Sequence, residues 1–125
     1  MKALDASAIL AFMFGEPGHE AVEASLADAC ASTVNLAEVI ARFTRDGHSG
    51  LQVQAMLEAT AIRWLPFDVQ QAALSADLLP RTKGKGLSLG DRACLALALS
   101  MGCPAVTADA QWKNLDLGID VELIR

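Results

Sequence analysis

Short apolar segments of strand composition alternate along this chain with longer segments of helical periodicity. Residues 2–4 lead directly into a helical pattern, and similar strand segments recur at 29–33, 62–65 and 105–107. The last segment, 119–124, alternates apolar and acidic side chains, as edge strands do. Because strands separated by helices favour a parallel sheet with right-handed crossovers, we expect an α/β fold in which helices flank a short central parallel sheet.

Capping residues and helix breakers predict where the longer helices begin and end. Asp68 and Ser88 are good N-caps, and Pro80 and Gly102 are expected to end the helices that follow them. Asn35 is expected to open another helix, which Asp46-Gly47 stops. The helices predicted in this way cover 35–45, 50–60, 69–79 and 89–101, and a Gly- and Lys-rich loop is expected at 81–87.

Length and composition indicate one compact domain spanning residues 1–125. The chain is 53% hydrophobic, which suits one sizeable core. No apolar run approaches the roughly 18 to 20 residues that cross a bilayer, so no membrane partner is expected. The N-terminal residues meet an acid too early for a secretory signal, which favours a cytoplasmic location. The cysteines number three and show no metal-ligand spacing, so we interpret them as reduced core residues.

Four acids stand where a strand should end or a helix should begin, and these are Asp5, Glu38, Asp91 and Asp109. In open parallel sheets, ligands bind beyond the carboxyl ends of the strands, so the four carboxylates are expected to converge at that edge. Carboxylate oxygens suit hard cations such as Mg²⁺ or Mn²⁺, which can activate water to cut phosphodiesters. The sequence therefore predicts a divalent-metal site for phosphodiester hydrolysis.

Each acid also has a purely structural explanation. Asn35-x-x-Glu38 and Ser88-x-x-Asp91 resemble capping boxes, in which the acid bonds back to the backbone of the cap residue. Asp5 and Asp109 fit Asx-type turns. Four such coincidences would have to occur at one edge, however, and clustered carboxylates repel one another when no cation is bound.

Each of the four acids lies in a distinct sequence block. The blocks are Leu4-Asp5-Ala6-Ser7-Ala8, Asn35-Leu36-Ala37-Glu38-Val39, the stretch from Gly86 to Ala96 containing Ser88-Leu89-Gly90-Asp91-Arg92, and Thr107-Ala108-Asp109-Ala110-Gln111-Trp112. Together they resemble PIN-domain ribonucleases of the VapC toxin type. They occur in the family's order across the chain. The resemblance implies a PIN-like fold and an Mg²⁺-dependent RNA endonuclease, with Mn²⁺ as a possible substitute, from a type II toxin–antitoxin pair.

The same resemblance implies roles for individual residues. The family's catalytic and metal-binding acids match Asp5, Glu38, Asp91 and Asp109, with none missing. Thr107 matches a hydroxyl residue that supports the acids, and Ser7 is a candidate for similar support or for an ordinary helix-capping hydroxyl. A small protein antitoxin that occupies the active-site groove is implied as a partner, and so is a homodimer.

Charge and apolar patterning suggest where RNA and a second subunit would bind. The net charge is −5, and neutralising four acids with metal would leave −1. A local basic stretch is then a candidate RNA contact, although a solvated loop is an equally good interpretation of Arg81, Lys83, Lys85 and Arg92. We expect dimerisation through exposed apolar residues of the two helices after Glu38, namely Val39, Ile40, Phe43, Val53, Met56 and Leu57.

Two other classes of function remain open from the sequence. A catalytically idle PIN-like module that binds RNA or protein would have the same fold, and a metal titration would distinguish it from an enzyme. A small-molecule phosphatase or hydrolase is disfavoured because the chain has no Gly-rich phosphate loop, no G-x-S-x-G elbow and no Asp-x-Asp pair.

Overall fold

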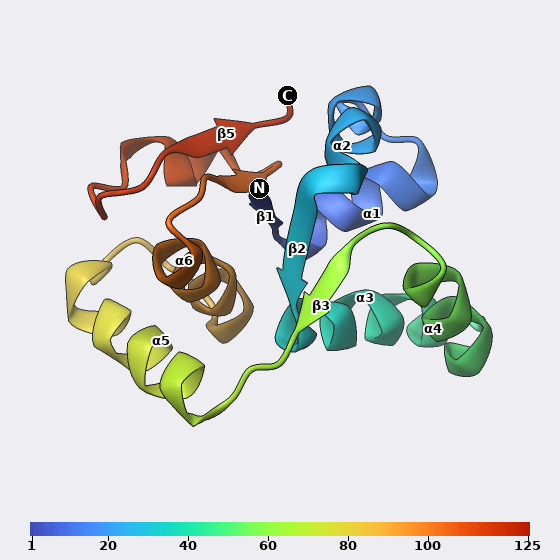
Figure 1. Ribbon diagram of the computed structural model, residues 1–125, viewed down its shortest axis with the longest axis horizontal. Helices are drawn as coiled ribbons and strands as arrows, with labels where there is room; N and C mark the ends of the chain where they lie inside the picture. The colour runs from blue at the N-terminus through green and yellow to red at the C-terminus, as the bar shows by residue number, and fades with distance from the viewer.

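Five parallel strands form one central sheet in the computed structural model, which describes residues 1–125 (Figure 1). The strand order is β3-β2-β1-β4-β5, so β1 lies in the centre and β5 at an edge, as its alternating pattern predicts. The strands are β1 (Lys2–Leu4), β2 (Ala29–Ser32), β3 (Arg63–Leu65), β4 (Ala105–Thr107) and β5 (Val121–Leu123). The expected α/β architecture with a short parallel sheet is confirmed.

Helices cover both faces of this sheet. Helices α1 to α4 lie on one face and α5 and α6 on the other (Figure 1). The α-helices are α1 (Ala6–Phe14), α2 (His19–Ser25), α3 (Thr33–Arg45), α4 (Gly50–Glu58), α5 (Val69–Arg81) and α6 (Leu89–Met101), and the 3₁₀ turns are η1 (Leu26–Asp28) and η2 (Ala110–Asn114). None of these helices combines the length and the apolar character that crossing a membrane requires.

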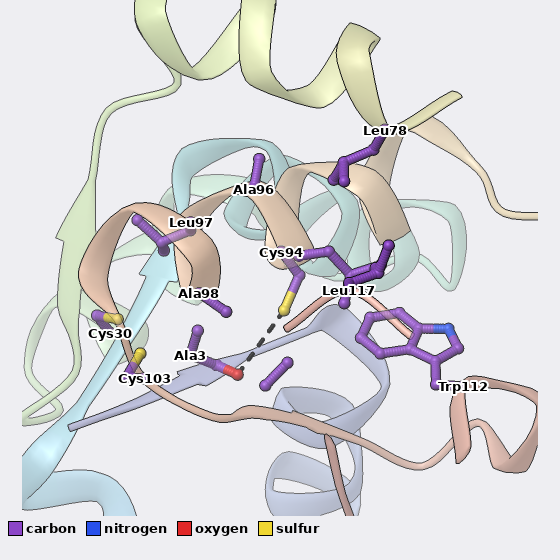
Figure 2. Packing of buried hydrophobic residues seen from close by; sticks show 12 residues of the cluster. Ala3, Cys30, Leu78, Cys94, Ala96, Leu97, Ala98, Cys103, Trp112 and Leu117 are labelled. Carbon is purple, nitrogen blue, oxygen red and sulfur yellow. Dashed lines mark hydrogen bonds between the residues drawn. The ribbon is translucent and has the colours of Figure 1, made fainter. Parts of the chain in front are cut away.

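The strands supply both cores because successive side chains point to opposite faces. Ala3 and Cys30 pack toward α6 and η2, whereas their neighbours Leu4 and Ala31 pack toward α1 and α3. In the first core the thiol of Cys94, on α6, contacts the Ala3 carbonyl oxygen at 3.7 Å (Figure 2). All three cysteines are buried and unpaired, as predicted, and Trp112 is fully buried in the same core.

Three predicted helix boundaries were wrong, and one of them is the end of α4, which lies at Glu58 instead of residue 60. Helix α3 begins at Thr33, and the hydroxyl of Ser32 accepts a hydrogen bond from the Val34 N–H at 3.1 Å. Asn35 therefore lies inside the helix and is not its cap. Helix α5 continues to Arg81 with Pro80 in its last turn. The Thr82 N–H donates to the Leu78 carbonyl oxygen at 3.0 Å and so completes the last turn. Pro80 has no N–H, so the helix loses only the hydrogen bond that this one residue would have donated.

The apolar surface expected on α3 and α4 is mostly internal. Four of the six residues predicted to be exposed are buried in the second core, namely Val39, Phe43, Val53 and Leu57. The sheet and α1 cover more of these helices than their amphipathic patterns suggested. Met56 stays 58% exposed, and Leu51 on the same helix is 81% exposed.

Candidate active site at the carboxyl edge of the sheet

The topology of the sheet places a crevice next to β1. The chain runs from β1 outward to β2 and β3, and then crosses to β4 on the other side of β1. Such a reversal is where open α/β sheets bind ligands, beyond the carboxyl ends of the two strands. Asp5 follows β1 directly, and Thr107 is the last residue of β4. These two residues therefore meet at the reversal.

Asp5 is held there by three donors. Its side chain caps α1 by accepting from the Ala8 N–H at 2.8 Å, and Oδ1 also accepts from the Ser7 hydroxyl at 2.7 Å. Thr107 Oγ1 donates to Asp5 Oδ2 at 2.5 Å. The Asp5 residue is only 4% exposed. Its rotamer is thus fixed by groups from both sides of the crevice.

The electrostatics of Asp5 are unusual for an aspartate. Burial raises the pKa of Asp5 to about 6, against hydrogen bonds from Thr107, Ala8 and Ser7 that lower it. The negative charge of Asp91 raises this pKa further. A carboxyl group desolvated beside a second acid is the arrangement found at many functional sites.

Ser7 and Thr107 continue the network toward the fourth acid. The Ser7 hydroxyl accepts from the Ala108 N–H at 2.9 Å and lies 3.3 Å from Thr107 Oγ1. Thr107 Oγ1 accepts from the Asp109 N–H at 3.0 Å. These two hydroxyl groups therefore join the loop after β4 to the start of α1.

Asp109 itself caps the turn that follows. Its Oδ1 accepts from the Gln111 N–H at 2.9 Å at the start of η2. The Asx-type bond considered for this residue is present. The second carboxylate oxygen accepts no protein hydrogen bond, which leaves it available to a ligand.

Asp91 lies in the first turn of α6. It forms the predicted capping box with Ser88, in which the Ser88 N–H donates to Asp91 Oδ2 at 2.9 Å and the Asp91 N–H donates to the Ser88 hydroxyl at 3.1 Å. The structural explanation for Asp91 is therefore realised. Oδ1 takes no part in the box, so capping and ligand binding are compatible.

Glu38 reaches the same edge from the second turn of α3. Because the helix begins at Thr33, the capping box proposed for Asn35 and Glu38 does not form. Instead, the Asn35 side chain donates from Nδ2 to Glu38 Oε1 at 2.8 Å. Desolvation raises the pKa of Glu38, the bond from Asn35 lowers it, and the charge of Asp91 raises it. Asp91 thus acts electrostatically on both Asp5 and Glu38.

The four acids do not form a closed cluster in this arrangement. No three side chains among the Asp, Glu, His and Cys residues stand close enough to hold a metal ion. Each acid instead bonds to neighbours on its own element or on β4, as expected for carboxylates that repel one another. The donor set, with four acids contributing hard oxygens and two pKa values raised at one edge, fits a divalent cation such as Mg²⁺.

The predicted basic residues fall into two groups. Arg81, Lys83 and Lys85 are exposed at the end of α5 and in the loop after it, where Lys83 lines a surface cavity of about 480 Å³. Arg92 is half-buried instead, and its Nη1 donates to the Ser75 carbonyl oxygen on α5 at 3.3 Å. Its guanidinium group therefore ties α6 to α5, a position that the sequence did not indicate.

Comparison with known proteins agrees with this architecture. The family model of the PIN domain matches residues 2–117. No curated relative matches the sequence. Among solved structures, a toxin–antitoxin complex from Klebsiella pneumoniae is 17% identical, with a TM-score of 0.78 over 100% of this chain and 98% of that one.

Two further structures share the fold. DNA-bound VapBC from Salmonella typhimurium is 20% identical, with a TM-score of 0.75 over 99% of this chain and 98% of that one. VapC20 from Mycobacterium tuberculosis, described as a sarcin-ricin loop cleaving toxin, is 16% identical, with a TM-score of 0.73 over 96% of this chain and 99% of that one. Since the family match spans nearly the whole chain, this protein belongs to the PIN domain family.

Proposed function

We propose that this chain is an Mg²⁺-dependent endoribonuclease and the toxin of a type II toxin–antitoxin pair. The observation that carries the proposal is the buried Asp5 carboxylate, fixed by Ser7 and Thr107 at the reversal of the sheet and influenced by the charge of Asp91. Family membership and the fold shared with toxin–antitoxin proteins support it.

The proposal assigns separate roles to metal-binding, positioning and RNA-binding residues. Asp5, Glu38, Asp91 and Asp109 would hold Mg²⁺, or Mn²⁺ in its place. When bound, the cation supplies activation of water and neutralisation of charge at the phosphodiester. Thr107 and Ser7 fix the orientation of Asp5, so the carboxylate is positioned before any ligand arrives. Arg81, Lys83 and Lys85 are proposed to contact the RNA backbone beside the acids.

Metal dependence is the direct test. Purified protein should cut structured RNA in Mg²⁺ or Mn²⁺, and excess EDTA should abolish the cutting. Asp5→Asn should remove activity as well, while Asp116→Asn, at an exposed acid outside the site, should leave it unchanged. Cleavage that persists undiminished in EDTA would rule out the metal mechanism.

A catalytically idle module that binds RNA or protein is the second candidate. The observation in its favour is that Asp91 and Asp109 are already engaged as helix and turn caps, and no three acids stand within reach of one ion. For such a module, a titration with Mn²⁺ would show no binding, and RNA would be bound but recovered intact. A cation that binds and supports cleavage would exclude it.

Partner and location complete the proposal. We infer a small protein antitoxin as the natural partner, because the solved structures that share the fold include complexes of toxin with antitoxin. We also infer a cytoplasmic location, in keeping with three unpaired, buried cysteines. A short reading frame overlapping the start of this one, whose product suppresses RNA cleavage in a mixing assay, is the expected finding.

A further inference from the structure

Asn35 is a buried amide with an unusual set of contacts. Only 1% of the residue is exposed, and it extends from α3 toward the start of α6. Nδ2 donates to two acceptors, Glu38 Oε1 at 2.8 Å and the Gly90 carbonyl oxygen at 3.1 Å. Because both partners only accept, the orientation of the amide is determined. Asn35 therefore joins Glu38 to the residue that precedes Asp91.

Gly90 makes this junction possible. A Cβ atom added at Gly90 would collide with the carboxylate of Glu38. The carboxylate therefore lies directly against the backbone of α6, in space that a side chain at position 90 would have to share. Asn35 donates to this carboxylate, and the missing side chain at Gly90 leaves it room beside the first turn of α6.

If Asn35 served only to hold α3 against α6, it would not need both of its hydrogen bonds. The bond from Asn35 to the Gly90 carbonyl alone would join α3 to α6. The second N–H is instead directed at an acid whose residue is exposed to solvent.

We propose that Asn35, together with Gly90, positions the Glu38 carboxylate for cation binding beside Asp91. This inference rests on the proposed metal-dependent function and assigns a role to two residues that are not themselves ligands. Partners that orient a metal-binding group typically change metal affinity by about 10-fold to 100-fold when they are removed. Asn35 should therefore act on the cation only through Glu38.

A double-mutant cycle tests this dependence by measuring Mn²⁺ affinity with electron paramagnetic resonance. Asn35→Ala should weaken Mn²⁺ binding about 10-fold to 100-fold in the natural chain and should have no further effect in a Glu38→Ala background. Gln54→Ala, which removes an exposed amide on α4, is the matched control and should leave affinity unchanged. Thermal unfolding of the metal-free proteins measures the structural contribution separately.

Gly90→Ala provides a second variant that does not alter the amide. It should displace Glu38 and weaken Mn²⁺ binding to a similar degree, so the test survives if Asn35→Ala fails to fold. Equal losses from Asn35→Ala with and without Glu38 would show that Asn35 acts on the fold, and unchanged affinity in both single variants would also overturn the proposal. A natural chain that binds no Mn²⁺ would overturn the proposed function itself, which is a different result.

Discussion

The energetics of Asp5 set the pH dependence of stability at the scale of single residues. The pKa of Asp5 is raised in the folded protein to about 6 from an ordinary value of 3.8. Between these values the folded chain binds more protons than the unfolded chain, so raising the pH through this window destabilises the fold. A shift of this size corresponds to about 3 kcal/mol at neutral pH. The site is thus maintained at a cost in stability.

Replacing this carboxylate should therefore stabilise the protein. In EDTA, Asp5→Asn should unfold at higher urea concentration than the natural chain at about pH 7, with a gain of up to about 3 kcal/mol and little difference near about pH 4. Urea denaturation followed by circular dichroism measures both, with Asp116→Asn as the control for loss of a surface charge. A variant less stable at neutral pH would show that the hydrogen bonds outweigh desolvation.

Asp91 caps α6 and is a proposed metal ligand, and substitution can separate these two roles. Ser88→Ala removes the cap of α6 and should cost about 1 kcal/mol of unfolding free energy, while RNA cleavage persists. Asp91→Asn should leave folding largely intact and reduce cleavage at least about 100-fold, because it removes a proposed metal ligand. Parallel urea titrations and cleavage assays of both variants provide the measurements. If Asp91 only capped the helix, the two substitutions would lower stability alike and neither would affect cleavage.

At the scale of elements, capping residues predicted most helix boundaries, and the remaining boundaries depend on tertiary contacts. Asp68 and Ser88 cap α5 and α6 as expected, because each hydroxyl or carboxylate bonds to a backbone N–H nearby in sequence. Ser32 was missed as a cap because it also ends a buried strand. The register of α3 was therefore fixed by the sheet, which a linear pattern does not record.

The sequence indicates where the four acids stand relative to the strands and helices, but it does not indicate which residues contact them. An acid directly after a strand can be read from the chain, as with Asp5. The contact between Asn35 and Gly90 depends on two helices whose contacting residues are 55 positions apart in sequence. Only the approach of α3 to α6 gives these residues a shared role. In the same way, the bond from Arg92 to the Ser75 carbonyl oxygen depends on the packing of α6 against α5, which the sequence does not record.

The loop between α5 and α6 is the element on which RNA contact can be tested. Replacing Arg81, Lys83 and Lys85 together with Ser should weaken RNA binding and lower the slope of log affinity against log salt by roughly 2 to 3, since each lost phosphate contact releases about 0.7 to 0.9 fewer counterions. Filter binding in Ca²⁺ over a range of salt concentrations measures the slope.

Metal affinity should stay unchanged in this variant, because none of the three side chains offers an oxygen ligand. Lys113→Ser, at an exposed cation in η2, serves as the control for a change in net charge. If the slope of log affinity against log salt is unaltered in the triple variant, the three side chains are merely solvated. The RNA would then bind elsewhere along the carboxyl edge of the sheet.

At the scale of the whole molecule, the surface that remains apolar on α4 determines the expected assembly. We expect a homodimer, because Leu51 and Met56 remain exposed on α4. Met56 also lines an apolar surface cavity of about 440 Å³, together with Phe12, Met13, Ala59 and Thr60. Light scattering on the order of tens of micromolar should give the mass of two chains. Leu51→Asp combined with Met56→Asp should give a monomer.

A matched substitution identifies the surface responsible. Val69→Asp introduces the same charge at a residue that is 82% exposed on α5, and it should leave the dimer intact. A monomeric mass for the natural chain would contradict the expectation directly. Dissociation by the α5 substitution and not by those on α4 would move the interface to the other face of the sheet.

The bond between Asp5 and Thr107 also has a consequence for synthesis on the ribosome. The two residues are separated by 102 positions in the sequence, and β4 completes the neighbourhood of β1 late in the chain. While a growing chain emerges, Asp5, Glu38 and Asp91 are all present before Thr107 and Asp109 have been added. Strand pairing over such a distance in sequence forms slowly. Under the proposed function, a chain that ends before β4 lacks both the Thr107 bond to Asp5 and the Asp109 carboxylate, so RNA cleavage would begin only once translation had passed β4.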